Sequence, residues 1–584
     1  MTTRPAERDA PAQWSLCPSC NRHLYLPKLR RNLGVCQECS HHLRLGIDER
    51  LETLLDPGGL RRYDADLTTH DPLGFVDRKP YTERLAAARE ATGRAEAAVW
   101  GTGAIGGYPV VLACLDFTFM GGSVGAVTGE LIARAARHAL ETRTPLILVS
   151  ASGGARMQEG TLSLMQLAKT AQELGRLREE GVLSVNVNTD PTYGGATASF
   201  SVLGDVVIAE PGARVGFAGP QVIRQTIRQE LPKGFQTAEF LRSHGLLDLV
   251  VPRHELRSTL TRLLALHTDR SGGGGSAAPA APEEAVAPGE AGGARGRVAR
   301  AAPSGPSGSS APSGPPARTA AESVALARDI GRPTTLDYCG LVFEDFLEFH
   351  GDRVSGDDLA IVAGVASLDG RPVVVLGHQK GHDTAELVRR NFGMPQPSGY
   401  HKARRLMEHA ERHRMPVVAF IDTPGAHPGI EAEERGQGAA IAECILGMAR
   451  LTVPTIAIVT GEGGSGGALA LGVGNRVLIL ENAYYSVISP EGCSTILFGS
   501  AAESAKAAEQ LRIGSTELLC LGIVDGVVPE PPGGAHTDRA ATAEALGAAL
   551  RSALAEFDGV PADRVVALRH ERFARFGNPT EVQR

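Results

Sequence analysis

The chain has 584 residues, of which 42% are hydrophobic and 21% are charged. These shares are ordinary for a globular protein and exclude a chain that is disordered throughout. The formal net charge of −7 argues against a protein that binds polyanions with its whole surface.

Neither a membrane span nor a secretory signal is predicted. Every apolar stretch of about 18 residues is interrupted by charges or clustered glycine, and the first 16 residues lack an apolar core. Nine cysteines in so long a chain do not form a secreted disulfide framework, which would be short and cysteine-dense. We therefore expect a cytoplasmic protein with no membrane partner.

A change in composition divides the chain near its middle. Between residues 271 and 320, 40 of 50 residues are Ala, Gly, Pro or Ser. Such a stretch buries too little apolar surface to offset its ordering entropy, so we predict a disordered linker. The predicted organisation is a flexible N-terminus (1–16), a cysteine module (17–45), a first large domain (46–270), the linker (271–320), a second large domain (321–575) and a C-terminal tail (576–584).

The N-terminal module carries two C-x2-C pairs separated by fifteen residues. Four thiolates at this spacing predict a tetrahedral Zn²⁺ site, which is structural because it leaves no position open for water. The predicted ligands are Cys17, Cys20, Cys36 and Cys39. A modest basic patch follows, formed by Lys28, Arg30 and Arg31. This patch leaves nucleic-acid binding open, although a solvated face or a docking surface is favoured.

The two large domains repeat one pattern. Each has two apolar strands that run into glycine-rich turns, and the predicted strands are 144–150, 182–187, 416–421 and 453–459. The segments after the second turn also correspond, residues 203–210 with residues 473–481. Strands that alternate with helical stretches in a degenerate repeat predict two α/β domains of the same fold.

Glycine pairs mark the turns of both domains. A Gly-Gly pair where a strand meets a helix exposes backbone N–H groups that can hold an anionic oxygen. We therefore predict catalytic oxyanion sites at Gly194, Gly195, Gly466 and Gly467. A third pair, Gly153 and Gly154, is expected to shape the substrate pocket. The alternative is that these glycines only allow a helix and a strand to pack closely.

Two common catalytic motifs are missing. The sequence has no G-x-x-x-x-G-K-[ST] phosphate loop, so no ATP site is expected in this chain. It also lacks a G-x-S-x-G nucleophile elbow paired with His and Asp. Asp422 and Glu462 end predicted strands, where turn capping is the favoured role.

Longer motifs resemble a known family. The two cysteine pairs, ASGGARMQE (151–159) and DPTYGG (190–195) resemble the β subunit of bacterial acetyl-CoA carboxylase carboxyltransferase. GHQKG (377–381), RRNFGMP (389–395) and GEGGSGGA (461–468) resemble its α subunit. The chain is therefore similar to β and α subunits fused in that order.

The resemblance implies a crotonase-like ββα superhelix in each large domain and a zinc ribbon before them. It implies transfer of a carboxyl group to acetyl-CoA, giving malonyl-CoA, from carboxybiotin on a separate carrier protein. In that reaction Gly194-Gly195 would hold the enolate oxygen and Gly466-Gly467 the biotin ureido oxygen. Partners would be biotin carboxylase, the biotin carboxyl carrier protein and a second copy of the chain, in a homodimer or larger assembly.

Side chains for CoA phosphates and other activities also follow from the resemblance. Candidate phosphate contacts are Arg156, Lys380, Arg389 and Arg390. A carboxyltransferase for another short acyl-CoA, such as propionyl-CoA, remains an alternative. A zinc-ribbon regulator that binds nucleic acid is the other.

Overall fold

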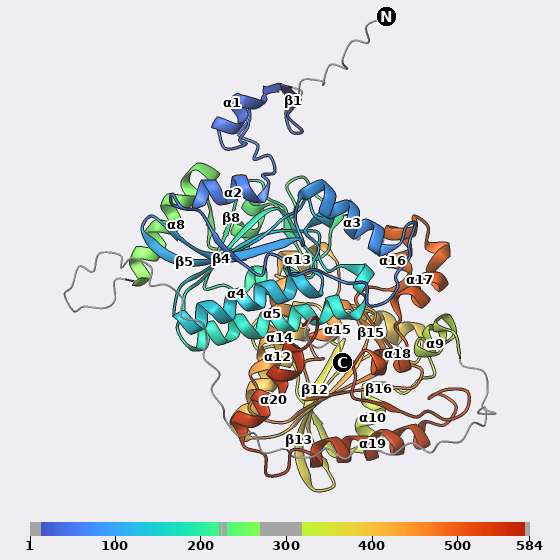
Figure 1. Ribbon diagram of the computed structural model, residues 1–584. Helices are drawn as coiled ribbons and strands as arrows, with labels where there is room; N and C mark the ends of the chain where they lie inside the picture. The colour runs from blue at the N-terminus through green and yellow to red at the C-terminus, as the bar shows by residue number, and fades with distance from the viewer. Residues whose placement is uncertain (1–12, 221–222, 225–229, 269–317, 579–584) are drawn as a thin grey trace, which may run out of the picture.

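The computed structural model describes residues 13–220, 223–224, 230–268 and 318–578. Figure 1 shows two sheets with helices between them, one sheet in the N-terminal half (residues 46–268) and one in the C-terminal half (318–578). Residues 1–12, 269–317 and 579–584 lie outside the described residues, and so does nearly all of the predicted linker.

The cysteine module stands at one end of the N-terminal half (Figure 1). It contains β1 (Trp14–Leu16), β2 (His23–Tyr25) and α1 (Leu26–Arg31). The prediction of a flexible N-terminus through residue 16 was wrong at its end. Trp14 pairs with Tyr25 in an antiparallel ladder, and their rings lie 5.1 Å apart. This ring contact and the ladder hold residues 14–16 in a strand.

The two halves have the same sheet topology, so the predicted repeat and the α/β fold class are confirmed. In each half two antiparallel pairs lead into a parallel series, and a short strand pairs on one side of the main path. The N-terminal sheet runs in the order β10 (Leu249–Val250), β8 (Val206–Ala209), β7 (Ser184–Tyr193), β6 (Leu146–Ser152), β5 (Tyr108–Leu115), β4 (Ala98–Ile105) and β3 (Arg61–Tyr63), with β9 (Val215–Gly216) on β7.

The C-terminal sheet repeats this order. It comprises β11 (Glu344–Glu348), β12 (Ile361–Leu368), β13 (Arg371–His378), β14 (Val417–Thr423), β15 (Thr455–Gly464), β16 (Arg476–Leu480) and β18 (Gly526–Val528), with β17 (Tyr484–Ser486) on β15. The four predicted strands match β6, β7, β14 and β15 but end too early. The second strand of each half continues into its glycine-rich segment because β9 and β17 pair with that extension.

Helices cover the sheets on both faces. The N-terminal half contributes α2 (Ile47–Leu54), α3 (Tyr81–Thr92), α4 (Ala126–Thr142), α5 (Thr161–Glu179), α7 (Ala238–Ser243) and α8 (Arg253–Thr268). The C-terminal half contributes α9 (Ala320–Ala327), α10 (Thr335–Val342), α11 (Thr384–Arg389), α12 (Pro397–His413), α13 (Ile430–Glu434), α14 (Gln437–Arg450), α15 (Ser465–Leu469), α16 (Pro490–Cys493), α17 (Ser504–Leu511), α18 (Ser515–Cys520), α19 (Arg539–Ala555) and α20 (Ala562–Ala574). None of the helices in the described ranges has the length and apolar character needed to cross a membrane.

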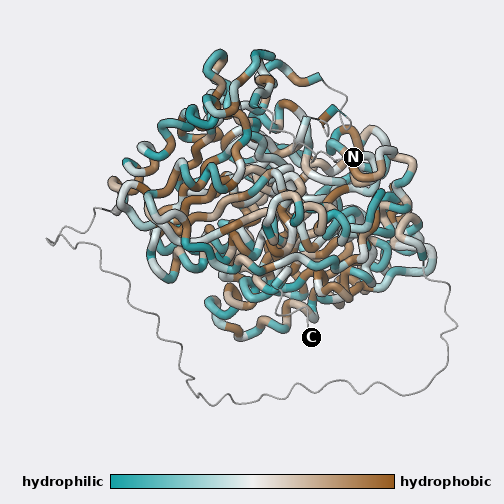
Figure 2. The backbone as a smooth tube through the Cα atoms, turned by 45° about the horizontal axis from the view of Figure 1, so that its top comes forward, coloured by the Kyte–Doolittle hydropathy of each residue, from teal (hydrophilic) through white to brown (hydrophobic). Residues whose placement is uncertain are grey.

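The core lies along the parallel strands. Every residue of β14 and of β15 is buried, as expected for strands covered by helices on both faces. Figure 2 shows the same distribution, with hydrophobic segments concentrated inside and hydrophilic segments toward the periphery. This rigid core fixes the strand ends, and the turns that follow them carry the candidate site.

The two halves pack against each other through helices. α5 lies against α14, and α20 of the C-terminal half lies against α5. At the crossing, a Cβ on Gly175 would lie 2.4 Å from Leu446 Cδ1, so α5 and α14 approach closely because this residue has no side chain. Lys169 Nζ donates to the Phe576 carbonyl (2.9 Å). The halves therefore form one continuous interface within a single chain.

Two predicted boundaries need correction at this interface. Phe576 is 3% exposed and belongs to the core, so the predicted C-terminal tail does not begin there. At the end of the predicted linker, Thr319 caps α9, which begins at Ala320, and Arg318 donates to Asn482. Both ends are held by contacts that the composition of the sequence does not reveal.

Candidate active site

A tight turn follows β6 in the N-terminal half. The Gly154 N–H donates to Ser152 Oγ (3.1 Å), and the Gly153 N–H donates to the Gly121 carbonyl (2.8 Å). The N–H of the next residue, Ala155, has no acceptor among the described residues. The turn thus directs one unpaired backbone donor away from its own hydrogen bonds.

The glycine pair after β7 supplies a second donor. The Gly194 N–H is already used, because it donates to the Gly216 and Phe217 carbonyls (3.2 and 3.1 Å). The Gly195 N–H, by contrast, finds no acceptor within the described part of the chain. A Cβ on Gly195 would lie 3.3 Å from the Ala155 nitrogen, so these two amides are neighbours. Together they have the composition of an oxyanion hole.

The C-terminal half repeats this arrangement. In the turn Thr423-Pro424-Gly425-Ala426, the Gly425 N–H donates to Thr423 Oγ1 (3.0 Å), as Gly154 does to Ser152. The Ala426 N–H has no acceptor among the residues described. Gly466 and Gly467 lie in the first turn of α15, where N–H groups lack intrahelical acceptors. A Cβ on Gly467 would lie 2.4 Å from the Ala426 nitrogen.

The two predicted glycine pairs meet at the interface between the halves. Leu167 of α5 lies between them: its Cδ1 is 3.1 Å from the Cβ position of Gly195, and its Cδ2 is 3.7 Å from that of Gly466. Gly195 is half-buried, whereas Gly466 and Gly467 are buried. One chain therefore brings both turns close together, with a single side chain separating them.

A cavity of about 790 Å³ adjoins the N-terminal turn. Its walls include Met120, Gly121, Gly153, Ala155 and Met157, and Leu497 of the C-terminal half also lines it. The predicted pocket role of Gly153 agrees with this position. The cavity is large enough for a small-molecule ligand and reaches the unpaired Ala155 amide.

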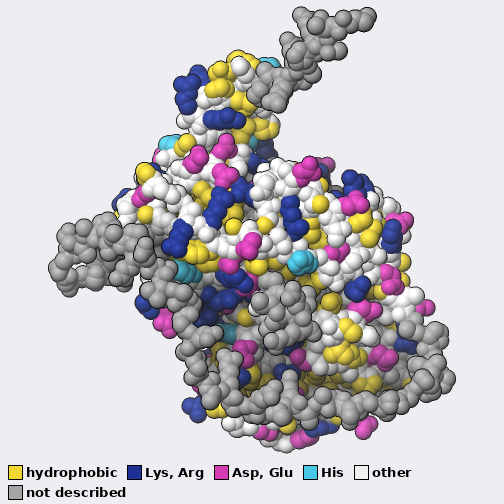
Figure 3. Space-filling view, in the orientation of Figure 1, with side chains coloured by type: hydrophobic (Ala, Val, Ile, Leu, Met, Phe, Trp, Pro, Cys, Tyr) yellow, Lys and Arg dark blue, Asp and Glu magenta, His cyan; other side chains and the backbone are white. Residues whose placement is uncertain are grey.

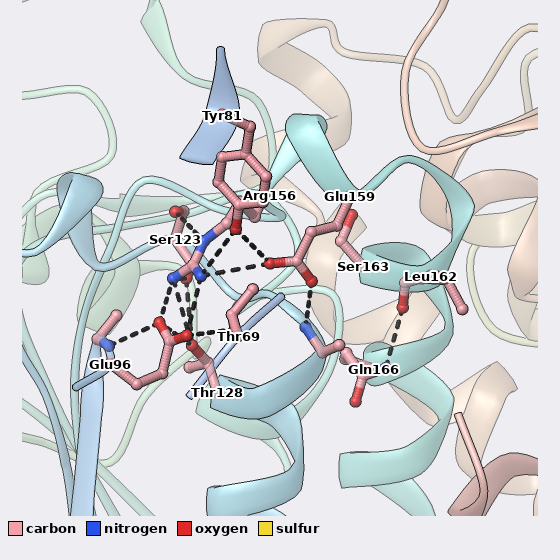
Figure 4. Close-up of polar contacts among 12 residues, drawn as sticks. Thr69, Tyr81, Glu96, Ser123, Thr128, Arg156, Glu159, Leu162, Ser163 and Gln166 are labelled. Atoms are coloured by element: carbon pink, nitrogen blue, oxygen red, sulfur yellow. Dashed lines mark hydrogen bonds and ion pairs between the residues drawn. The ribbon is translucent and has the colours of Figure 1, made fainter. Parts of the chain in front are cut away.

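The structure gives Arg156 a role other than the predicted phosphate contact. Its side chain is fully buried and pairs with Glu96 (2.6 Å) and Glu159 (3.3 Å). Figure 4 shows the guanidinium enclosed by these carboxylates, Tyr81 and Ser123. Burial alone would raise the pKa of Glu96, but the Arg156 charge lowers it below its ordinary value. Arg156 thus anchors the turn that carries Ala155, and no part of it faces a ligand.

Two of the other predicted basic contacts also point inward. Lys380 Nζ pairs with Asp422 Oδ1 (2.8 Å) and Glu462 Oε1 (2.7 Å). Arg390 donates to the Leu359 carbonyl (2.9 Å), and its side chain is 11% exposed. Arg389 is 61% exposed at the end of α11. Of the four predicted residues, only Arg389 has an exposed guanidinium.

The Lys380 cluster braces the turn of the C-terminal half. Glu462 also pairs with Arg328 (2.7 Å) and accepts from the Tyr484 hydroxyl (2.6 Å). Burial disfavours the Glu462 carboxylate, but the charges of Lys380 and Arg328 outweigh burial and lower its pKa to about 2. Asp422 Oδ1 accepts from the Glu462 N–H (2.9 Å), which agrees with the capping role predicted for Asp422.

The four cysteines of the ribbon gather at one point. Their Sγ atoms all lie within 4.8 Å of one another, a spacing that four ligands of a single metal ion would have. Lys28, Arg30 and Arg31 are exposed on the same module. Figure 3 shows basic side chains on the ribbon and also on the N-terminal half below it.

The sequence prediction missed two donors of the site, the Ala155 and Ala426 amides. A signal for them was present, because S-G-G-A (152–155) and T-P-G-A (423–426) end equivalent strands with a hydroxyl residue three positions before an alanine. Leu167 carried no signal, since its place between the glycine pairs depends on how the halves pack.

Comparison with known proteins covers nearly the whole chain. The family described as carboxyl transferase domain matches residues 70–253, and the family described as acetyl co-enzyme A carboxylase carboxyltransferase-like matches residues 317–577. Among solved structures, a transcarboxylase 12S core is 23% identical with a TM-score of 0.34, covering 89% of this chain and 91% of its own.

Curated relatives share the fused arrangement. The acetyl-coenzyme A carboxylase carboxyl transferase subunits beta/alpha of Saccharopolyspora erythraea are 63% identical over 577 residues, covering 98% of this chain and 96% of that protein. The protein of the same name from Clostridium tetani is 43% identical and covers 89% of this chain and 85% of its own length. The chain therefore belongs to the acetyl-CoA carboxylase carboxyltransferase family, with its β-type and α-type parts joined in one polypeptide.

Proposed function

We propose that this chain transfers a carboxyl group from carboxybiotin, held on a separate carrier protein, to acetyl-CoA to form malonyl-CoA. The observation that carries the proposal is the pair of matching amide sites, Ala155 with Gly195 and Ala426 with Gly467. The reaction develops two anions, and each site offers two backbone donors to one of them.

The chemistry divides between the two sites. Cleavage of the N–C bond of carboxybiotin releases CO₂ and leaves a ureido anion, whose oxygen the Ala426 and Gly467 amides would stabilise. The biotin nitrogen then takes a proton from the acetyl methyl group, and the resulting enolate oxygen meets the Ala155 and Gly195 amides. Attack of the enolate carbon on CO₂ forms the new C–C bond. Losing one such donor typically costs about 3–4 kcal/mol of transition-state stabilisation.

This mechanism needs no side-chain base. The buried carboxylates near the turns, Glu96 and Glu462, are held in ion pairs that lower their pKa values. They brace the amides while positioning and preorganised dipoles supply the rate. Gly154 is assigned with Gly153 to the pocket for the acyl group, and Arg389 remains the candidate contact for an external phosphate.

The partners follow from this reaction. Biotin carboxylase would form carboxybiotin with ATP, and the biotin carboxyl carrier protein would bring it to this chain. A second copy of the chain is proposed as well, giving a homodimer or larger assembly.

The reverse reaction tests the proposal with small molecules. Purified chain, malonyl-CoA and free biotin should yield acetyl-CoA, measured by chromatography, at a rate that rises with biotin concentration. Acetyl-CoA formation that is absent, or independent of biotin, would contradict it.

We also propose that the four ribbon cysteines hold a structural Zn²⁺. Four thiolates fill its tetrahedral shell, so the ion would stabilise the ribbon without taking part in transfer. Cys36→Ser should lower the zinc content measured by atomic emission from about one ion per chain to a small fraction. An unchanged zinc content would argue against a four-thiolate site.

A further inference from the structure

The two halves share a turn whose backbone is left-handed over three consecutive residues. In both halves the middle residue stands five positions before the helix that follows, α4 or α12. These middle residues are therefore structural equivalents, although one is glycine and the other is phenylalanine. The turns are Met120 (φ 47°), Gly121 (φ 68°) and Gly122 (φ 61°), and Asn391 (φ 47°), Phe392 (φ 54°) and Gly393 (φ 73°).

A second glycine differs between the halves beside this turn. Gly153 follows Ser152 in the N-terminal half, and Pro424 follows Thr423 at the equivalent place. The Gly153 N–H donates to the Gly121 carbonyl, but proline has no N–H to offer. The C-terminal half thus has a bulkier residue at both positions.

In the N-terminal half, the two glycines line open space. Both belong to the wall of the cavity of about 790 Å³, and a Cβ on Gly121 would meet no atom within 4 Å. With no side chains at these positions, a long and narrow ligand can reach the Ala155 amide. The thioester arm of an acyl-CoA has that shape.

In the C-terminal half, an aromatic ring is held at the equivalent position. Phe392 is 45% exposed and makes no ring contact with any residue that the structure describes. A bulky residue with positive φ is uncommon and strained, and such strain concentrates at functional sites. Gly393 anchors the turn, since its Cβ position lies 3.1 Å from the Asp422 carbonyl. The exposed ring is therefore fixed beside the strand that leads into Thr423–Ala426.

We propose that these two positions decide which substrate each amide site accepts. Phe392 and Pro424 fit the C-terminal site to a compact, apolar, bicyclic ureido ring, and they narrow it against a CoA arm. Gly121 and Gly153 leave the N-terminal site open to the acyl-CoA. This inference rests on the proposed function and adds the residues that assign its two substrates.

Reciprocal variants test the assignment through the Michaelis constants of the biotin-dependent reverse reaction. Phe392→Gly should raise KM for biotin about tenfold and leave KM for malonyl-CoA unchanged. Gly121→Phe should raise KM for malonyl-CoA about tenfold and leave KM for biotin unchanged. Gly121→Asn is the second variant at this position, because asparagine tolerates left-handed backbone, and it should shift the same constant less.

Val388→Ser is the matched control. Val388 is 61% exposed on α11, near Phe392 in sequence but outside the turn, so both constants should stay at wild-type values. Unchanged constants in Phe392→Gly and Gly121→Phe, or shifts in the opposite substrates, would overturn the inference. A wild-type chain without biotin-dependent activity would instead defeat the proposed function itself, so the two failures are distinguishable.

Discussion

At the scale of single residues, burial decides what a charged side chain does. Arg156 and Arg389 are both arginines in family-like motifs, and the sequence predicts the same phosphate contact for each. The structure buries the first between two carboxylates and leaves the second 61% exposed. The sequence reports the charge of a side chain but not its accessibility, so this difference could not be predicted.

The contrast between these arginines yields a stability prediction. Arg156→Met should lower the free energy of unfolding by about 3–5 kcal/mol, because it leaves Glu96 and Glu159 buried without their cation. Arg389→Met should stay within about 1 kcal/mol of wild type, since an exposed pair contributes little. Urea denaturation followed by circular dichroism measures both. Equal effects of the two substitutions would show that the Arg156 network does not stabilise the fold.

Other parts of the site were readable residue by residue. The glycine pairs were found because Gly-Gly after an apolar strand is a local signal. Gly194, however, uses its N–H within the protein, and the free donors are Gly195 and its neighbour Ala155. Local sequence thus located the turn but could not say which amides in it remain unpaired.

At the scale of elements, strand positions follow from the sequence and strand ends do not. The predicted strand 182–187 corresponds to β7, which continues to Tyr193 because β9 pairs with the extension. The pairing partner lies more than twenty residues away along the chain. Apolar periodicity therefore gives the buried part of a strand, while long-range pairing sets where the strand stops.

The α5–α14 contact can be tested with two glycines in helix interiors. Gly→Ala in a helix normally stabilises by about 1 kcal/mol. Gly447→Ala of α14 should show this gain, since its Cβ would lie no closer than 3.6 Å to a neighbour. Gly175→Ala should lose the gain or destabilise, because its Cβ would meet Leu446 at 2.4 Å. Thermal unfolding compares them, and a higher melting temperature for Gly175→Ala would contradict the close crossing.

At the scale of the whole molecule, the two halves form one interface that the linker composition does not predict. The sequence indicated two homologous domains and a tether, which would permit them to stay apart. Contacts such as α20 on α5, or Leu497 at a cavity of the other half, depend on residues hundreds of positions apart. No local pattern encodes them, which is why the separation of the glycine pairs by Leu167 could not be predicted.

One carboxyl group makes this interface sensitive to pH. Glu433 of α13 accepts from the Phe217 and Ala218 amides of the N-terminal half (3.1 and 2.7 Å). Burial raises the pKa of Glu433 to about 7, although these two donors oppose the shift. The folded state then binds a proton that the unfolded state releases above about pH 4.5, so the free energy of unfolding should fall as pH rises from about 4.5 to 7.

The variant Glu433→Gln isolates this effect. The expected loss for wild type across the interval is about 3 kcal/mol, from 1.36 kcal/mol per pKa unit. The variant should lack that part of the slope, as measured by denaturant unfolding at several pH values. Identical slopes in the two proteins would mean that Glu433 keeps an ordinary pKa.

The central claim is that unpaired backbone amides stabilise the reacting oxygens, and Gly195→Ala tests it most directly. The added Cβ would lie 3.3 Å from the Ala155 nitrogen and 3.1 Å from Leu167 Cδ1, so it should displace the two donors slightly without unfolding the chain. Gly46→Ala is the matched control in the same half, because its Cβ would meet no atom within 4 Å. We predict that kcat for biotin-dependent acetyl-CoA formation falls about tenfold to a hundredfold in Gly195→Ala and stays at the wild-type value in Gly46→Ala. Wild-type kcat in a folded Gly195→Ala protein would contradict the account.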